Sequence, residues 1–246
     1  MVYEKNFNYK RGRKSVKNPK IRLIFCDVDG TLLKKGEETV KNSVFHAIKE
    51  AVKSGIHFVI ASGRPYYDLK SLFLPVSDLV TFISCDGALT VQNKKIINSY
   101  TIDEFIINRF NEFSGKKMYS KDSILNSPSS DIYKLAFCNT SPFEKQKIEI
   151  VAKNTGKLTK IYSDPSWIEF VSKDVNKGKA AYWLKKSLGI SELETAAFGD
   201  NLNDIEMLRC ASITYSSTDA IPEIKRMCKY NTKDIPSEIL KIAQER

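Results

Sequence analysis

The sequence predicts an α/β fold in which a parallel sheet carries helices on both faces and a smaller α+β unit is inserted. Apolar stretches of strand length alternate with amphipathic helical stretches over residues 21–86 and again over 175–246. Between them, residues 87–174 place strands and helices in an order typical of an antiparallel α+β unit. We therefore expect a three-layer core domain formed by the two outer stretches and a second domain formed by the insertion.

The first stretch begins with the apolar run 21–26, which we interpret as a buried strand that ends in the tight turn Asp27-Val28-Asp29-Gly30-Thr31. Apolar residues at helical spacing then predict a helix that ends at Gly55. In chain order the elements predicted after the turn are a helix at 40–53, a strand at 56–61, a helix at 65–73 and a strand at 79–84.

The insertion opens with two short strands over 88–100 around the polar turn Gln92–Lys95. A helix over 101–113 is expected to begin at Thr101, with Glu104 three residues later in the pattern of a capping box. The elements expected after it are a polar loop at 120–131, a strand at 132–138, a helix at 142–154 and strands at 157–162 and 167–172.

The strand–helix alternation returns after Lys177. The predicted elements there are a helix at 178–188, a strand at 196–198, a helix at 203–209, a strand at 211–215 and helices at 219–228 and 236–244. Such alternation implies parallel strands joined by helices. The carboxyl ends of parallel strands share one edge of the sheet, which is where open α/β sheets bind ligands.

Basic charge is concentrated at the start of the chain. The protein has 39 Lys and Arg against 29 Asp and Glu, a net charge of +10. Residues 1–20 hold seven basic side chains and one acidic one, so this tail alone carries +6. We expect the tail to be disordered. Its aromatic residues among basic ones leave open an anchor for nucleic acid.

The composition excludes several classes of protein. A hydrophobic share of 42% does not fit a disordered or collagen-like chain. No apolar stretch approaches the about 20 residues that a bilayer-spanning helix needs, so we expect no membrane association. The five cysteines are odd in number and form no CxxC pair. They favour reduced thiols and therefore a cytoplasmic protein.

Acidic and hydroxyl side chains follow the predicted strands. They are Asp27, Asp29, Ser62, Asp86, Asp200 and Asp204. Carboxylates gathered at one sheet edge repel one another, and a hard divalent cation such as Mg²⁺ with oxygen ligands relieves that repulsion. With Lys177 and Arg64 as neighbouring cations, this set suits the handling of a phosphoryl group.

Four short motifs carry a resemblance to a known family. They are Asp27-Val-Asp-Gly-Thr31, Ser62-Gly-Arg64, Lys177-Gly178 and Gly199-Asp-Asn-Leu-Asn-Asp204. Together, and in this order, they resemble the haloacid dehalogenase superfamily, and in detail its Cof-type phosphatases with a C2-type cap. The resemblance implies a Rossmann-like core over 21–86 and 175–246 and a cap over 87–174, and it does not extend to the tail.

The resemblance also implies roles for individual residues. Asp27 would attack phosphorus and become an aspartyl-phosphate, and Asp29 would act as general acid and base. The expected Mg²⁺ ligands are the Asp27 side chain, the Asp29 carbonyl and Asp200, with Asp204 in support. The expected phosphate-binding residues are Ser62, Lys177, Gly30 through its backbone, Arg64 and Asn203. Lys177 and the metal are expected to keep the pKa of Asp27 low.

Other positions keep more than one interpretation. Asp86 stands where Cof-type proteins often have asparagine, and we interpret it as a turn residue rather than as a charge at the core–cap junction. Thr31 has a structural interpretation as the cap of a turn, and Arg64 has one as the partner of a surface carboxylate in an ion pair. The candidate specificity residues of the cap are Tyr119, Lys121, Lys134, Trp167 and Glu169. A lysine-rich cap would suit a substrate with a second acidic group.

We therefore predict Mg²⁺-dependent hydrolysis of a small phosphomonoester, such as a sugar phosphate, through an aspartyl-phosphate. One alternative is a sugar phosphomutase or phosphotransferase on the same fold. Another is a nucleic-acid-associated protein anchored by residues 1–20. The sequence leaves the substrate and the oligomeric state open.

Overall fold

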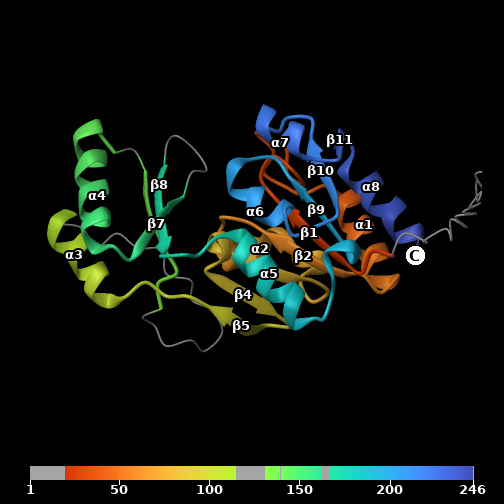
Figure 1. Cartoon of the computed structure of the whole chain (residues 1–246), viewed down its shortest axis with the longest axis horizontal. Helices are drawn as coiled ribbons and strands as arrows, with labels where there is room; N and C mark the ends of the chain where they lie inside the picture. The colour runs from red at the N-terminus through yellow and green to blue at the C-terminus, as the bar shows by residue number, and fades with distance from the viewer. Residues whose placement is uncertain (1–19, 115–130, 139, 162–166, 246) are drawn as a thin grey trace, which may run out of the picture.

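The computed structural model describes residues 20–114, 131–138, 140–161 and 167–245 (Figure 1). Some predictions therefore lie wholly or almost wholly outside the described residues. They are the disordered basic tail over 1–20, the polar loop at 120–131 and the roles of Tyr119 and Lys121.

An eight-stranded sheet forms the core, in the order β11-β10-β9-β1-β2-β3-β4-β5. Its strands are β1 Leu23–Asp27, β2 His57–Ala61, β3 Thr81–Ser84, β4 Leu89–Gln92, β5 Lys95–Ser99, β9 Thr195–Gly199, β10 Ile213–Ser217 and β11 Tyr230–Thr232. The strands from β11 to β3 pair in parallel, while β4 and β5 pair antiparallel. The predicted α/β fold with a mostly parallel sheet is confirmed.

Helices cover both faces of this sheet. Alternate residues of β1 divide between two apolar clusters, with Ile24 in one and Phe25 in the other, because successive side chains of a strand point to opposite faces. The first cluster is covered by α1 Asn42–Lys53, α2 Tyr66–Leu72 and α8 Ile235–Gln244. The second is covered by α5 Lys177–Ser187, α6 Ile205–Leu208 and α7 Pro222–Met227.

The insertion forms its own small α+β unit, seen at the left of Figure 1. Its antiparallel sheet has the order β6-β8-β7, and α3 and α4 pack on it around a separate apolar cluster that includes Phe110, Phe137 and Phe170. The bounds are α3 Glu104–Ser114, β6 Lys134–Cys138, α4 Pro142–Thr155, β7 Leu158–Ile161 and β8 Trp167–Ser172.

The strand pairing indicates that the inserted unit begins later in the sequence than predicted. Residues 88–100 form the predicted hairpin, but β4 pairs with β3 and so extends the core sheet rather than the sheet of the insertion. We propose a first domain boundary near residue 100 in place of 87, and we keep the second near 174.

Two local predictions were wrong. Helix α3 begins at Glu104 rather than Thr101, because the Asp103 carboxylate accepts a hydrogen bond from the Phe105 N–H and occupies the start of the helix. The helix predicted at 203–209 divides into a 3₁₀ turn at Leu202–Asp204 and the short α6. Within the described residues, the structure has no helix long and apolar enough to span a bilayer.

Candidate active site

The candidate site lies where the parallel strands of the core sheet end. Asp27 is the last residue of β1, and Ser62, Cys85 and Asp200 directly follow β2, β3 and β9. These ends meet because the four strands are parallel neighbours. A cleft of about 840 Å³ opens there, and residues of the insertion line its other wall.

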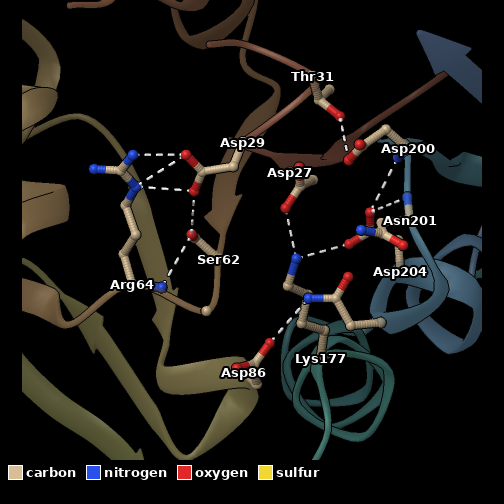
Figure 2. A network of polar contacts seen from close by, with 12 residues as sticks. Asp27, Asp29, Thr31, Ser62, Arg64, Asp86, Lys177, Asp200, Asn201 and Asp204 are labelled. Atoms are coloured by element: carbon tan, nitrogen blue, oxygen red, sulfur yellow. Dashed lines mark hydrogen bonds and ion pairs between the residues drawn. The ribbon is translucent and has the colours of Figure 1, made fainter. Parts of the chain in front are cut away.

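A buried ammonium group holds two carboxylates at the bottom of the cleft. Lys177 Nζ lies 2.5 Å from Asp27 Oδ1 and 2.7 Å from Asp204 Oδ1, and all three side chains are buried (Figure 2). Lys177 is placed there because Asn176 caps helix α5, accepting a hydrogen bond from the Lys179 N–H with its side chain. The predicted convergence of Asp27 and Lys177 is therefore present in the geometry.

Three carboxylates form a group that suits a cation. One oxygen each of Asp27, Asp200 and Asp204 lies within 4.8 Å of the others. Asp27 Oδ2 is buried and has no hydrogen-bond partner among the described residues. With all three carboxylates ionised, the group and Lys177 together would carry a net charge of −2. A buried unpartnered carboxylate oxygen and an all-oxygen donor set fit a hard divalent cation.

The electrostatics of the protein alone oppose ionisation of Asp27 and Asp200. Burial raises the pKa of Asp27 well above its ordinary value, and Asp204 raises it further, while Lys177 partly offsets both effects. Burial and the charge of Asp204 also raise the pKa of Asp200, to about 6. We expected Lys177 and the metal to keep the pKa of Asp27 low. Lys177 alone does not lower this pKa below its ordinary value, because the effect of burial is larger than the effect of the lysine charge.

Asp204 serves both Lys177 and the loop after β9. Its Oδ2 accepts hydrogen bonds from the Asp200 N–H, at 3.0 Å, and the Asn201 N–H, at 3.2 Å. Both of its oxygens therefore already have partners. Asp204 therefore positions both the Lys177 ammonium and the start of the loop that carries Asp200.

Gly30 allows a close approach that no other residue permits. Its φ is +90°, and a Cβ there would lie 2.1 Å from Asp200 Oδ2. The Gly30 N–H donates to the Leu33 carbonyl at 2.7 Å, so it is used within the turn rather than left for phosphate as predicted. Thr31 Oγ1 donates to Asp200 Oδ1 at 3.5 Å.

Asp29, Ser62 and Arg64 form a second hydrogen-bonded group beside Asp27 (Figure 2). The Arg64 guanidinium binds the Asp29 carboxylate, with Nη2 at 2.6 Å from Oδ1 and Nε at 2.9 Å from Oδ2. Ser62 Oγ accepts from the Arg64 N–H at 3.1 Å and lies 3.5 Å from Asp29 Oδ2. Arg64 therefore forms an ion pair with a half-exposed carboxylate, as its structural alternative predicted, but that carboxylate belongs to the site itself.

Asp86 is a charged junction residue, contrary to the interpretation as a turn residue only. It is 1% exposed, and its Oδ2 lies 2.9 Å from Nζ of Lys134, which comes from the insertion. Asn203 Nδ2 donates to Asp86 Oδ1 at 3.0 Å, so this predicted phosphate ligand binds a carboxylate instead. The only sequence signal for the Asp86–Lys134 pair is the aspartate where the resembling proteins often have asparagine.

The described cap candidates all border the cleft. Lys134, Trp167 and Glu169 line it, and Trp167 is 43% exposed. They share one face of the cap sheet, since the register pairs Ala136 with Glu169 and Cys138 with Trp167. The opposite face, with Ile168 and Phe170, packs in the apolar cluster of the cap.

A core sheet with a carboxylate-rich cleft at its strand ends, covered by an inserted α+β cap, defines a capped phosphate-handling hydrolase. The family profile described as "haloacid dehalogenase-like hydrolase" matches residues 24–119 and 106–238. The chain belongs to this family, as its motifs predicted, and it is an enzyme of the phosphatase type.

Curated relatives share about a quarter of their residues with this chain. A Streptococcus pyogenes protein, provisionally named a phosphatase, is 27% identical over 87% of this chain and 93% of its own length. Phosphatase YwpJ of Bacillus subtilis is 26% identical over 83% and 92%. The Escherichia coli 5-amino-6-(5-phospho-D-ribitylamino)uracil phosphatase YbjI is 25% identical over 85% and 90%.

Solved structures support the same fold. TM0651 from Thermotoga maritima aligns with a TM-score of 0.77 and 20% identity, covering 92% of this chain and 97% of its own. The subclass IIB sugar phosphatase BT4131 aligns with a TM-score of 0.69 and 20% identity, covering 91% and 98%.

Proposed function

We propose that this protein hydrolyses a small phosphomonoester, with Asp27 as the nucleophile and with Mg²⁺ as cofactor. The observation that carries the proposal is the Asp27 carboxylate. One of its oxygens is held by Lys177, while the other is buried and without a partner among the described residues. The unpartnered oxygen suits the cation, while the oxygen oriented by Lys177 is the one that would attack phosphorus.

Asp27 and Asp29 take complementary roles in this proposal. Asp27 attacks phosphorus, the phosphorus–oxygen bond to the leaving alcohol breaks, and an aspartyl-phosphate forms. Asp29, whose side chain is half exposed to the cleft, gives its proton to the departing alkoxide and later takes one from the water that hydrolyses the acyl phosphate. Asp27 depends on the cation for its ionisation, because burial raises its pKa, whereas Asp29 has to leave the Arg64 guanidinium before it can carry a proton.

Mg²⁺ fits the donor set described above. Asp27 and Asp200 would hold it, with the carbonyl of Asp29 as a further oxygen and Asp204 orienting Asp200. When bound, it would neutralise charge on the transferred phosphoryl group. Ser62 and Lys177 both lie near Asp27 and would provide donors for the phosphoryl oxygens (Figure 2).

The cleft and the relatives support a small-molecule substrate. A cleft of about 840 Å³ accommodates a metabolite rather than a macromolecule. The relatives include a phosphatase for a phosphoribitylamino-uracil and a phosphoglycolate phosphatase, and a structural neighbour is a sugar phosphatase. We propose a sugar phosphate or a similar small soluble phosphate ester.

Hydrolysis of p-nitrophenyl phosphate tests this function. We expect activity that needs Mg²⁺ and is lost on Asp27→Asn, because the amide retains size but not nucleophilicity. Full activity of this variant, or of the wild type in EDTA, would refute the proposal. Borohydride reduction during turnover should convert Asp27 to homoserine, detectable by mass spectrometry, as expected for an acyl phosphate. The predicted mutase alternative is tested by isomerisation of a sugar monophosphate in the presence of its bisphosphate.

A further inference from the structure

The turn after β3 holds a costly backbone conformation. Cys85, Asp86 and Gly87 have φ angles of 50°, 55° and 102°, so three successive residues lie in the left-handed region. Glycine adopts this region freely and aspartate tolerates it better than most residues, whereas cysteine does not. Such strain persists only where surrounding contacts over-determine it.

Backbone contacts tie this turn to the loop that follows β2. The Cys85 N–H donates to the Arg64 carbonyl at 3.0 Å, and the Asp86 N–H donates to the Ser62 carbonyl at 3.1 Å. A Cβ on Gly63 would lie 2.9 Å from Asp86 Oδ2, so the two segments are in close contact. The position of the Ser62–Arg64 loop therefore depends on the position of the turn.

The carboxylate of Asp86 is held from the cap. Burial alone would raise the pKa of Asp86, but the charges of Lys134 and Lys177 and two hydrogen bonds outweigh burial and lower it. Asp86 is thus an ionised, buried group. Breaking a buried pair by removing one partner leaves an uncompensated charge.

Lys134 uses its donors inside the protein. An ammonium group has three N–H donors. Lys134 Nζ lies 2.9 Å from Asp86 Oδ2, 3.0 Å from the Gly63 carbonyl oxygen and 2.7 Å from Glu169 Oε1. Two of these partners belong to the core and one to the cap. With its three donors so engaged and its side chain 8% exposed, Lys134 is suited to join the two domains rather than to contact substrate as predicted.

We propose that Asp86 and Lys134 are positioning residues, through which the cap fixes the strained turn and, with it, the Ser62–Arg64 loop in the arrangement that receives the phosphoryl group. The proposal rests on the proposed function, because it takes Ser62 as a phosphate ligand. It assigns the cap a part in catalysis that does not require contact with the leaving group.

Lys134→Met is the direct test, with p-nitrophenyl phosphate and Mg²⁺. The side chain keeps its length but loses the charge and all three donors. We expect kcat to fall on the order of 10²-fold, the effect of displacing a reacting group by about 1 Å, with a smaller change in KM. Asp86→Asn should also lower kcat more than it changes KM. The double variant Asp86→Asn/Lys134→Met should have a kcat no lower than that of the less active single variant.

Lys160→Met is the matched control. Lys160 lies in β7 of the same cap and pairs with Glu149 at 2.6 Å, but both side chains are substantially exposed. Its kcat should stay within about twofold of the wild type, because an exposed pair contributes little. If Lys134→Met also stays within that range, the proposal is wrong. Should Lys134→Met fail to fold, Asp86→Asn alone decides by the same criterion.

Amide hydrogen exchange separates this proposal from the proposed function. In Lys134→Met, and not in Lys160→Met, the amides of Arg64, Cys85 and Asp86 should exchange faster than in the wild type. Unchanged exchange at these amides overturns the proposal. An inactive wild type would instead overturn the proposed function, and the exchange measurement would still report on the network.

Discussion

Lys177 is the buried cation that compensates the carboxylates of Asp27 and Asp204. It faces Asp27 and Asp204 from the first turn of α5, and their charges raise its pKa in spite of its burial. We expect Lys177→Met to destabilise the protein by about 3–5 kcal/mol, because both carboxylates lose their buried partner. It should also lower kcat on the order of 10²–10³-fold, as removal of a charge-stabilising donor does.

Urea unfolding and p-nitrophenyl phosphate hydrolysis measure the two effects. Lys179→Met provides the comparison, since Lys179 lies two residues along the same helix and pairs with Asp174 only at the exposed surface. Its stability should change by less than about 1 kcal/mol. Equal effects of the two substitutions would contradict the role given to Lys177.

Asp200 gives the site a pH dependence of defined sign. Its folded pKa of about 6 lies above the ordinary value of 3.8, so between these values the folded state binds more protons than the unfolded one. The stability that Asp200 contributes is therefore full below about pH 4 and is lost as the pH rises through about 6.

Unfolding of the metal-free protein between pH 4 and 7, compared with Asp200→Asn, measures this contribution. The stability difference should shift in favour of the variant as the pH rises. Adding Mg²⁺ at pH 7 should then stabilise the wild type more than the variant, because a ligand of the folded state is lost in the variant. A difference that does not vary with pH would show that the Asp200 pKa is ordinary.

The sequence predicted which residues converge but not how they pair. Asp27, Ser62 and Asp200 follow neighbouring parallel strands, so their proximity follows from topology. The partners of Arg64 and Asn203 are other side chains of the site, and their identity depends on rotamers and on distances between loops. No local pattern records such long-range pairing.

At the scale of elements, the contact between α5 and α6 leaves no room for a side chain at Gly178. A Cβ there would lie 2.2 Å from Glu206 Cβ and 2.5 Å from the Glu206 carbonyl carbon. We expect Gly178→Ala to cost about 1–3 kcal/mol in spite of the better helix propensity of alanine, because backbone must move. Thermal unfolding against Lys179→Ala, an exposed change in the same helix, measures this cost. A rise in Tm for Gly178→Ala would contradict the packing argument.

Apolar periodicity predicted the type of most elements but missed the pairing of the edge strands. The 88–100 hairpin was recognised as a hairpin, yet strand patterns do not state which sheet they join, and β4 joined β3. β11 was missed because Tyr230–Thr232 has three residues, exposed or half-buried, and therefore shows no apolar pattern. Tyr215 of β10 stacks on Phe198 and contacts Tyr230, which holds this short strand at the sheet.

At the scale of the whole molecule, the predicted combination of a core and an inserted cap is present, and its two sheets are separate. Motif order made this predictable, since the strand-end residues lie on both sides of a long stretch with different patterning. The sequence left Asp86 open as a charge at the core–cap junction, but its partner Lys134 was not predictable, because the contact joins surfaces that the sequence specifies independently.

The place of β1 in the sheet has a consequence for synthesis. β1 lies between β2 and β9, so its second neighbour begins only at Thr195, after the whole cap has been translated. The nascent chain must therefore keep one edge of an apolar strand unpaired while the ribosome adds the cap. A fragment of residues 20–190, whose core sheet is incomplete, should bind a hydrophobic dye, whereas the full chain should not. The core sheet can therefore be completed only after the last third of the core has been synthesised. Contacts between residues so far apart in the sequence favour slow folding and reliance on chaperones.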